Sequence, residues 1–295
     1  IVKSDDSGEY YISLSAGEYK ILYSKEGYLS SSYYVKISEE ETIYIPTIKL
    51  FPSDVEDEEH LIYGLVTNAI TTDPVEGALV RFRSGWNNKD GDYIKDPKNP
   101  YASIILMTTT TGHYEVSLPV GNYTAEISKD GYITSYANVT TTKLSSIQYA
   151  IISPKLSDDV YRIVLTWGNT PSDLDSYLTG NIYGEKFQVN YYNQVYNYNN
   201  QTIATRDVDD TSGYGPETIT ITLYDSVGNF EYFIEDYTNN YNPNSMALSL
   251  SSAKVVVYKG NSLLATYHVP SGKTGRRWNV FSIIDGELKG INKIV

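Results

Sequence analysis

The chain has 295 residues, 30 tyrosines, no cysteine and a formal net charge of -13. The lack of cysteine excludes disulfides, thiolate metal sites and a cysteine nucleophile. The acidic balance argues against binding to nucleic acid or to an anionic membrane surface, and no apolar run is long enough to be inserted across a membrane. The abundance of Tyr, Thr, Val and Ile predicts an all-β protein.

Two segments near the start of the chain repeat nearly the same sequence. "SGEYYISLSAGEYKILYSKEGY" begins at Ser7, and "TGHYEVSLPVGNYTAEISKDGY" begins at Thr111, an offset of 104 positions. In each copy apolar residues alternate with polar ones, as in Tyr10, Ile12 and Leu14, which predicts a strand with one buried face. A Gly-containing turn and a second alternating strand follow, so we expect a β-hairpin in each copy.

The repeated motif resembles the signature of the carboxypeptidase regulatory-like domain, a small prealbumin-like β-sandwich. The earlier part of that family's pattern precedes the second copy in "LIYGLVTNAITTDPVEGALVRF", which begins at Leu61. The resemblance implies a complete domain over residues 58–156. Residues 1–52 carry only its later strands, so we expect an incomplete domain there, joined to the second copy by the acidic linker 51–60.

The incomplete first copy leaves two alternatives open. Half of a sandwich would expose its core face and a sheet edge. Upstream sequence of a longer multidomain chain could complete it, or a neighbouring subunit could supply the missing strand by β-augmentation. The second alternative would make the protein a subunit of a self-assembling filament.

From about Ser157 the pattern changes to short apolar strands separated by Gly, Asn and Pro turns, which predicts one larger β-sandwich over 157–295. "VLTWGNTPSDLDSYL", from Val164, and "VPSGKTGRRWNVFSIIDGELKGIN", from Val269, resemble the YfaP/DUF2135-type domain of exported bacterial and archaeal surface proteins. Members commonly have His after D-L-D-S, where this chain has Tyr177. The resemblance implies an extracellular location at a prokaryotic cell surface, and the whole chain would be a series of tandem β-sandwiches.

Acidic residues of the C-terminal region are spaced as ligands for a cation. Asp173 and Asp175 lie two apart, as do Asp207 and Asp209, so each pair would share one face of a strand. Hard oxygen ligands from two segments suit Ca²⁺. The predicted metal ligands are Asp173, Asp175, Asp207, Asp209, Asp210 and Glu217. The alternatives are solvated turn residues, or a glycosidase pair, which would require a substrate groove.

Two segments rich in Tyr and Asn, residues 190–201 and 237–244, have three interpretations. They could stack on sugar rings, or they could pack against another subunit. They could equally be exposed strand edges and a solvated loop.

These features together predict a non-enzymatic structural or adhesive surface protein. We expect it to associate with itself or with other surface proteins in a filament or surface layer, stabilised by Ca²⁺. The first alternative is a carbohydrate-binding accessory region of a larger secreted enzyme, with a glycan as its partner. An enzyme in its own right would need a deep cleft, and the sequence shows no catalytic motif that would line one.

Overall fold

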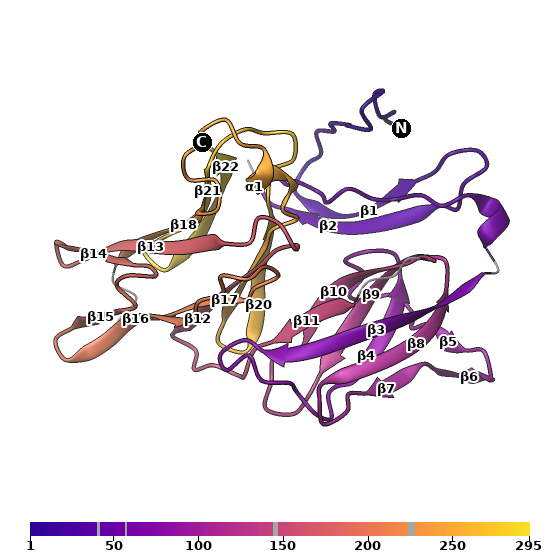
Figure 1. The fold of residues 1–295 in the computed structure, drawn as a ribbon, viewed down its shortest axis with the longest axis horizontal. Helices are drawn as coiled ribbons and strands as arrows, with labels where there is room; N and C mark the ends of the chain where they lie inside the picture. The colour runs from indigo at the N-terminus through magenta and orange to yellow at the C-terminus, as the bar shows by residue number, and fades with distance from the viewer. Residues whose placement is uncertain (40–41, 57, 144–146, 224–227) are drawn as a thin grey trace.

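A computed structural model describes residues 1–39, 42–56, 58–143, 147–223 and 228–295. The described chain is almost entirely β, as its composition predicts, and it forms tandem β-sandwiches. Its helices in these ranges are two short ones, η1 (Ser53–Val55) and α1 (Ala247–Leu250). Residue 57 of the predicted acidic linker lies outside the described residues. Figure 1 shows an N-terminal hairpin above a middle sandwich, with the C-terminal sandwich beside them.

The first copy of the repeat contains one antiparallel pair, β1 (Gly17–Tyr23) with β2 (Ser31–Ile37). The strand predicted over Tyr10–Leu14 does not form, so that prediction is wrong for the first copy. The alternation of apolar residues is present there, but the described chain places no neighbouring strand beside it. Backbone pairing and the burial that comes with it are what make such a segment a strand.

The second copy belongs to a complete sandwich of two sheets. The four-stranded sheet has the order β10-β9-β4-β7, and the three-stranded sheet has the order β11-β3-β8. The strands are β3 (Glu59–Asn68), β4 (Leu79–Ser84), β7 (Ile105–Met107), β8 (His113–Pro119), β9 (Gly121–Ser128), β10 (Ser135–Thr141) and β11 (Gln148–Ile152). A small ribbon, β5 (Lys95–Asp96) with β6 (Asn99–Ser103), lies between β4 and β7 in the chain.

The hairpin predicted within each copy is wrong in its pairing. In the second copy β8 pairs with β3, whereas β9 pairs with β4 and β10, so the chain passes from one sheet to the other at Val120. The hydroxyl of Tyr123 donates to the carbonyl of Pro119 at 2.9 Å and braces this crossing. Tyr19 donates to the carbonyl of Ser15 at 2.9 Å in the same way, so this one hydrogen bond is common to both copies.

The C-terminal sandwich is larger and closes around its own core. Its six-stranded sheet has the order β15-β16-β17-β12-β19-β20, and its five-stranded sheet has the order β14-β13-β18-β21-β22. The side chains of Tyr161, Tyr232 and Trp278 are fully buried between the sheets. The strands are β12 (Val160–Thr166), β13 (Leu174–Ile182), β14 (Glu185–Val189), β15 (Val195–Tyr198), β16 (Gln201–Val208), β17 (Glu217–Thr222), β18 (Asn229–Asp236), β19 (Lys254–Lys259), β20 (Ser262–His268), β21 (Arg277–Ile284) and β22 (Glu287–Ile294).

The middle sandwich contacts both of the other units. On the N-terminal side the amide of Trp86 donates to the carbonyl of Ser32 at 2.8 Å, and Tyr34 donates to the carbonyl of Trp86 at 3.1 Å. On the C-terminal side the hydroxyl of Thr218 donates to the buried carbonyl of Ala69 at 2.7 Å. A separate apolar cluster crosses this second junction and consists of Ala69, Ile133, Val164 and Tyr258. Buried apolar contacts and hydrogen bonds therefore hold the two sandwiches in one arrangement.

Candidate functional site

Three of the predicted metal ligands come together between the two sheets of the C-terminal sandwich. Asp173 immediately precedes β13, Asp175 is the second residue of β13, and Glu217 begins β17 in the opposite sheet. Each contributes a carboxylate oxygen to a group in which these atoms lie within 4.8 Å of one another. Asp175 is 3% exposed and Glu217 is fully buried. The spacing of Asp173 and Asp175 therefore did predict their convergence.

An arginine lies at the centre of these carboxylates. The Nη2 atom of Arg206, on β16, donates to Asp175 Oδ1 at 3.1 Å, to Asp209 Oδ1 at 2.8 Å and to Glu217 Oε1. The backbone amide of Ser176 also donates to Glu217 Oε2, at 2.6 Å. Arg206 was missed from the sequence, where the one signal was a lone cation beside a run of aspartates. It supplies one positive charge to a site with at least four carboxylates.

Asp207 and Asp210 do not join the cluster by direct contact. Asp207 accepts a hydrogen bond from the hydroxyl of Thr220 at 2.5 Å, on the side of the sheet away from Arg206. The prediction that Asp207 and Asp209 share a face is wrong because the register of β16 against β17 shifts between Arg206 and Val208. Asp210 accepts hydrogen bonds from the amide and hydroxyl of Ser212, at 2.7 and 3.1 Å, and closes a turn.

The cluster carries more negative charge than Arg206 offsets. Burial, together with the charges of Asp175 and Asp209, raises the pKa of Asp173 to about 6. Burial also raises the pKa of Glu217 well above its usual value, against the opposing effects of Arg206 and Ser176. The Oδ1 atom of Asp173 is buried and has no hydrogen-bond partner among the described residues. Such a site favours a proton or a second cation.

The same burial argues against a glycosidase. The acid and the nucleophile or base of such an enzyme must reach a sugar held in a groove. Asp175 and Glu217 instead face Arg206 in the interior of the sandwich. The geometry is that of a buried polar cluster inside the sandwich.

The two Tyr/Asn-rich segments meet at one place on the C-terminal sandwich. The rings of Tyr191 and Tyr237 lie 6.0 Å apart, edge to face, and Tyr191 lies 6.5 Å from Tyr177. Tyr177 in turn stacks on Phe233 with ring centroids 4.9 Å apart. Tyr191 and Tyr237 are 44% and 47% exposed, so the aromatic patch formed by Tyr177, Tyr191 and Tyr237 is open to solvent.

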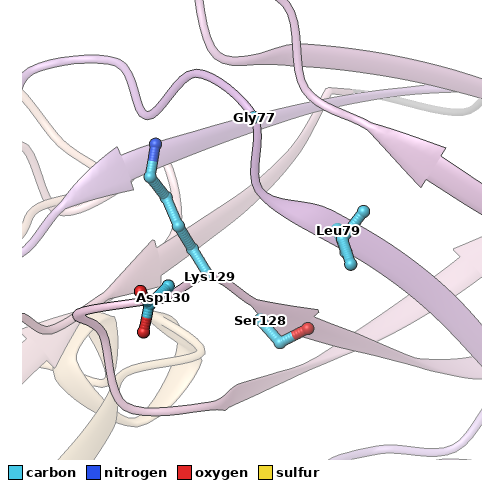
Figure 2. Close-up of a pocket in the computed structure, with 5 residues that line it drawn as sticks. All are labelled: Gly77, Leu79, Ser128, Lys129 and Asp130. Carbon is cyan, nitrogen blue, oxygen red and sulfur yellow. The ribbon is translucent and has the colours of Figure 1, made fainter.

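A shallow pocket lies on the middle sandwich, at the end of β9 (Figure 2). It is lined by Gly77, Leu79, Ser128, Lys129 and Asp130. The ammonium of Lys129 donates to the carbonyl of Glu76 and spans part of the pocket. With a single carboxylate beside this lysine, the pocket brings together no pair of groups suited to acid–base catalysis.

No family model matches the chain, and no curated protein matches it. Among solved structures it is similar to a protein of unknown function, SAV2460, with 15% identity, a TM-score of 0.33, and coverage of 48% of this chain and 94% of that one. It is also similar to a streptococcal ancillary pilin, with 14% identity, a TM-score of 0.27, and coverage of 74% of this chain and 66% of that one.

A third similar structure is a variant of BcpA, the major pilin subunit of Bacillus cereus. The identity is 13%, the TM-score is 0.27, and the match covers 72% of this chain and 70% of that one. At these identities and TM-scores, no property of those proteins is transferred to this chain. Separately, the described residues include no helix long and apolar enough to cross a membrane.

Proposed function

We propose that this chain is a non-enzymatic structural protein of a prokaryotic cell surface, which assembles with other molecules by strand complementation at its first copy. The proposal rests on the exposure to solvent of one side of that copy, the side that corresponds to the buried face of β8 in the second copy. Ile12 is 41% exposed, whereas its counterpart in the second copy, Val116, is 8% exposed. An apolar face beside unpaired backbone is a site at which another strand adds to a fold.

The rest of the architecture supports the same proposal. The middle and C-terminal sandwiches are joined through buried contacts, so the chain presents the open copy on a fixed support. The first copy itself is held to the middle sandwich by Asn122, whose amide donates to Ser31 Oγ at 2.9 Å and to the carbonyl of Lys49 at 2.8 Å. A series of joined β-sandwiches with one strand-accepting copy suits a filament or surface layer.

The test is assembly of the full chain as a function of its concentration, measured by light scattering and negative-stain electron microscopy. We expect assembly that Ile12→Asp abolishes, because a charge on the open face opposes apolar pairing. Tyr101→Asp is the matched control, since Tyr101 is 97% exposed on the ribbon strand β6. A chain that stays monomeric, or that assembles equally well with Ile12→Asp, would refute the proposal.

We further propose that Ca²⁺ stabilises the C-terminal sandwich through Asp173, Asp175, Asp209 and Glu217. The donor set fits, because Ca²⁺ prefers carboxylate oxygens, and Asp173 Oδ1 is buried without a partner in the described chain. Ca²⁺ bound only to the native state should raise the melting temperature in wild type, and a chelator should lower it. Asp173→Asn should remove this response, whereas Asp207→Asn should retain it, because Asp207 lies apart from the cluster. Equal melting with Ca²⁺ and with chelator would refute the site.

The second candidate function is carbohydrate binding, favoured by the aromatic patch. Exposed tyrosine rings offer flat apolar faces on which sugar rings can stack. We expect an insoluble neutral polysaccharide to retain the protein in a pull-down experiment, and Tyr191→Ala together with Tyr237→Ala to weaken that retention. Tyr101→Ala is the control for loss of an exposed tyrosine elsewhere. Retention that is unaffected by the paired substitution would exclude the patch as the site.

A further inference from the structure

The chain contains three Asn-x-Thr sequences in which x is not proline, and they begin at Asn122, Asn138 and Asn200. This sequence is the acceptor motif for N-linked glycans, which are bulky and therefore lie on the surface of an exported protein. The first two motifs lie in strands of the middle sandwich, and the third lies in the C-terminal sandwich. The surroundings of each motif decide whether a folded chain can carry a glycan there.

The two motifs of the middle sandwich are engaged in packing. Asn122 is 7% exposed, and its amide donates two hydrogen bonds across the junction to the first copy. The hydroxyl of Thr140, which completes the motif of Asn138, donates to Asn122 Oδ1 at 2.9 Å. Asn138 Oδ1 in turn accepts a hydrogen bond from the backbone amide of Asn87 at 2.9 Å. One hydrogen-bond network therefore holds both motifs in the folded chain.

The third motif lies at the tip of an exposed hairpin. Asn200 is the second residue of the two-residue turn between β15 and β16, and both Asn200 and Thr202 are exposed. The φ angle of Asn200 is 60°, which such turns require and which asparagine tolerates. Strand β15 is a four-residue edge strand, so this tip can open without disturbing the core. Figure 1 shows the hairpin pointing away from the middle sandwich.

A pair of tyrosine rings lies beside this turn. Tyr198 immediately precedes the two turn residues, and its ring stacks on the ring of Tyr183 with centroids 5.6 Å apart. Tyr183 lies in the neighbouring turn, between β13 and β14, and is 65% exposed. An exposed aromatic ring offers a flat apolar face against which a sugar can pack. The first sugar of a glycan on Asn200 would have this surface within its reach.

We infer that Asn200 is a site of N-linked glycosylation, and that the first sugar of the glycan packs on the rings of Tyr183 and Tyr198. The co-reactant is an oligosaccharide linked through pyrophosphate to a polyprenyl lipid. A bond forms between Asn200 Nδ2 and C1 of the first sugar, the bond between C1 and the pyrophosphate oxygen breaks, and one amide proton is released. This inference goes beyond the proposed function and rests on it only because an exported chain meets the membrane-bound transferase.

The test is glycan transfer onto the folded full chain by a purified oligosaccharyltransferase that requires only the Asn-x-Thr motif, with the lipid-linked oligosaccharide as donor. Peptide mass spectrometry should show the glycan at Asn200 alone, whereas peptides from a digest of the chain should accept it at all three motifs. Asn200→Gln and Thr202→Ala should each abolish transfer to the folded chain. Asn138→Gln is the matched control and should leave that transfer unchanged.

The packing of the sugar on the rings has its own measurement. The glycan should raise the melting temperature of the wild-type C-terminal sandwich by about 1–4 °C, and Tyr183→Ala should remove this gain. Tyr241→Ala, at a position that is 81% exposed in another loop of the same sandwich, should retain it. A glycan that leaves the wild-type melting temperature unchanged, or raises it equally in Tyr183→Ala, overturns the packing.

The outcomes of the transfer experiment separate this inference from the proposed function. A folded chain that accepts the glycan at Asn122 or Asn138, or that leaves Asn200 unmodified while the digest is modified, overturns the inference. Such a result leaves the proposed assembly intact, because the transfer uses purified components and needs neither assembly nor export. Transfer to Asn200 alone, in a chain that stays monomeric at every concentration, supports the glycosylation site while the proposed assembly fails.

Discussion

The two copies of the repeat share a sequence motif but differ in secondary structure and in burial. Tyr114, Val116 and Leu118 form one face of β8 and are buried against β3 and the opposite sheet. Their counterparts Tyr10, Ile12 and Leu14 lie in a segment without regular structure, and Ile12 is 41% exposed. The local sequence is nearly the same, so the difference comes from the strand that pairs with it. Alternating apolar residues allow a segment to form a strand, but the strand forms only when a neighbouring strand pairs with it.

The largest expected contrast is between matched leucines. Leu118→Ala removes a fully buried side chain from the middle sandwich and should cost about 2–5 kcal/mol in the free energy of unfolding. Leu14→Ala acts at the counterpart position on an open face and should cost less than about 1 kcal/mol. Chemical denaturation of the two variants measures both values. Similar losses would mean that the first copy already has a closed core.

A smaller effect is expected at the junction between the copies. Asn122→Ala removes both hydrogen bonds to the first copy and leaves the carbonyl of Lys49 without its donor, so docking should weaken by about 1–3 kcal/mol. Limited proteolysis should then release residues 1–52 sooner. The counterpart of Asn122 is Glu18, whose ion pair with Lys36 is exposed, so Glu18→Ala should change docking by less than about 0.5 kcal/mol. Release at the wild-type rate from Asn122→Ala would contradict the described junction.

Two equivalent tyrosines of the copies, Tyr19 and Tyr123, allow a finer comparison. Tyr123→Phe should cost about 1 kcal/mol, because it removes the hydrogen bond to Pro119 at a position that is 6% exposed. Tyr19→Phe breaks the equivalent bond to Ser15, but water can replace the lost donor there. Its effect on the melting temperature should therefore be smaller. A larger effect for Tyr19→Phe would reverse the order of stability assigned to the copies.

The smallest expected effect is a difference in pH dependence. Burial opposes ionisation of Glu126, but hydrogen bonds from Arg83 and Tyr93, with the charges of Arg83 and Arg81, outweigh it and lower its pKa. The stability it contributes to the middle sandwich is present above the usual glutamate pKa of about 4.5 and is lost as pH falls through the lowered value. The counterpart of Glu126 in the first copy is Leu22, which is 64% exposed, so this group gives that copy no such dependence.

The C-terminal sandwich should respond in the opposite direction. The pKa of Asp173 is raised to about 6, so its ionisation destabilises the native state, and stability falls as pH rises from about 4 to about 6. Hydrogen exchange of each unit between pH 4 and pH 7 tests both signs. A shared direction in the two sandwiches would contradict the charge arrangements described.

The sequence was sufficient for the all-β fold, the repeat and the convergence of Asp173 with Asp175. It was insufficient wherever pairing between distant strands decides the result. The alternation of apolar and polar residues could not show that β8 and β9 enter different sheets, because the two strands alternate in the same way. The shift of register in β16 separated Asp207 from Asp209. Arg206 meets Glu217 because β16 pairs with β17, and it meets Asp175 because the two sheets pack together.

The most direct test of the account is hydrogen exchange of the full chain, compared between residues 9–15 and residues 113–119 at increasing protein concentration. At the lowest concentration the first segment should exchange rapidly and the second slowly, because β8 is paired with β3 and the first segment has no strand beside it. Protection of residues 9–15 should then rise with concentration as a neighbour completes the copy. Equal protection of both segments in the dilute protein would contradict the open first copy.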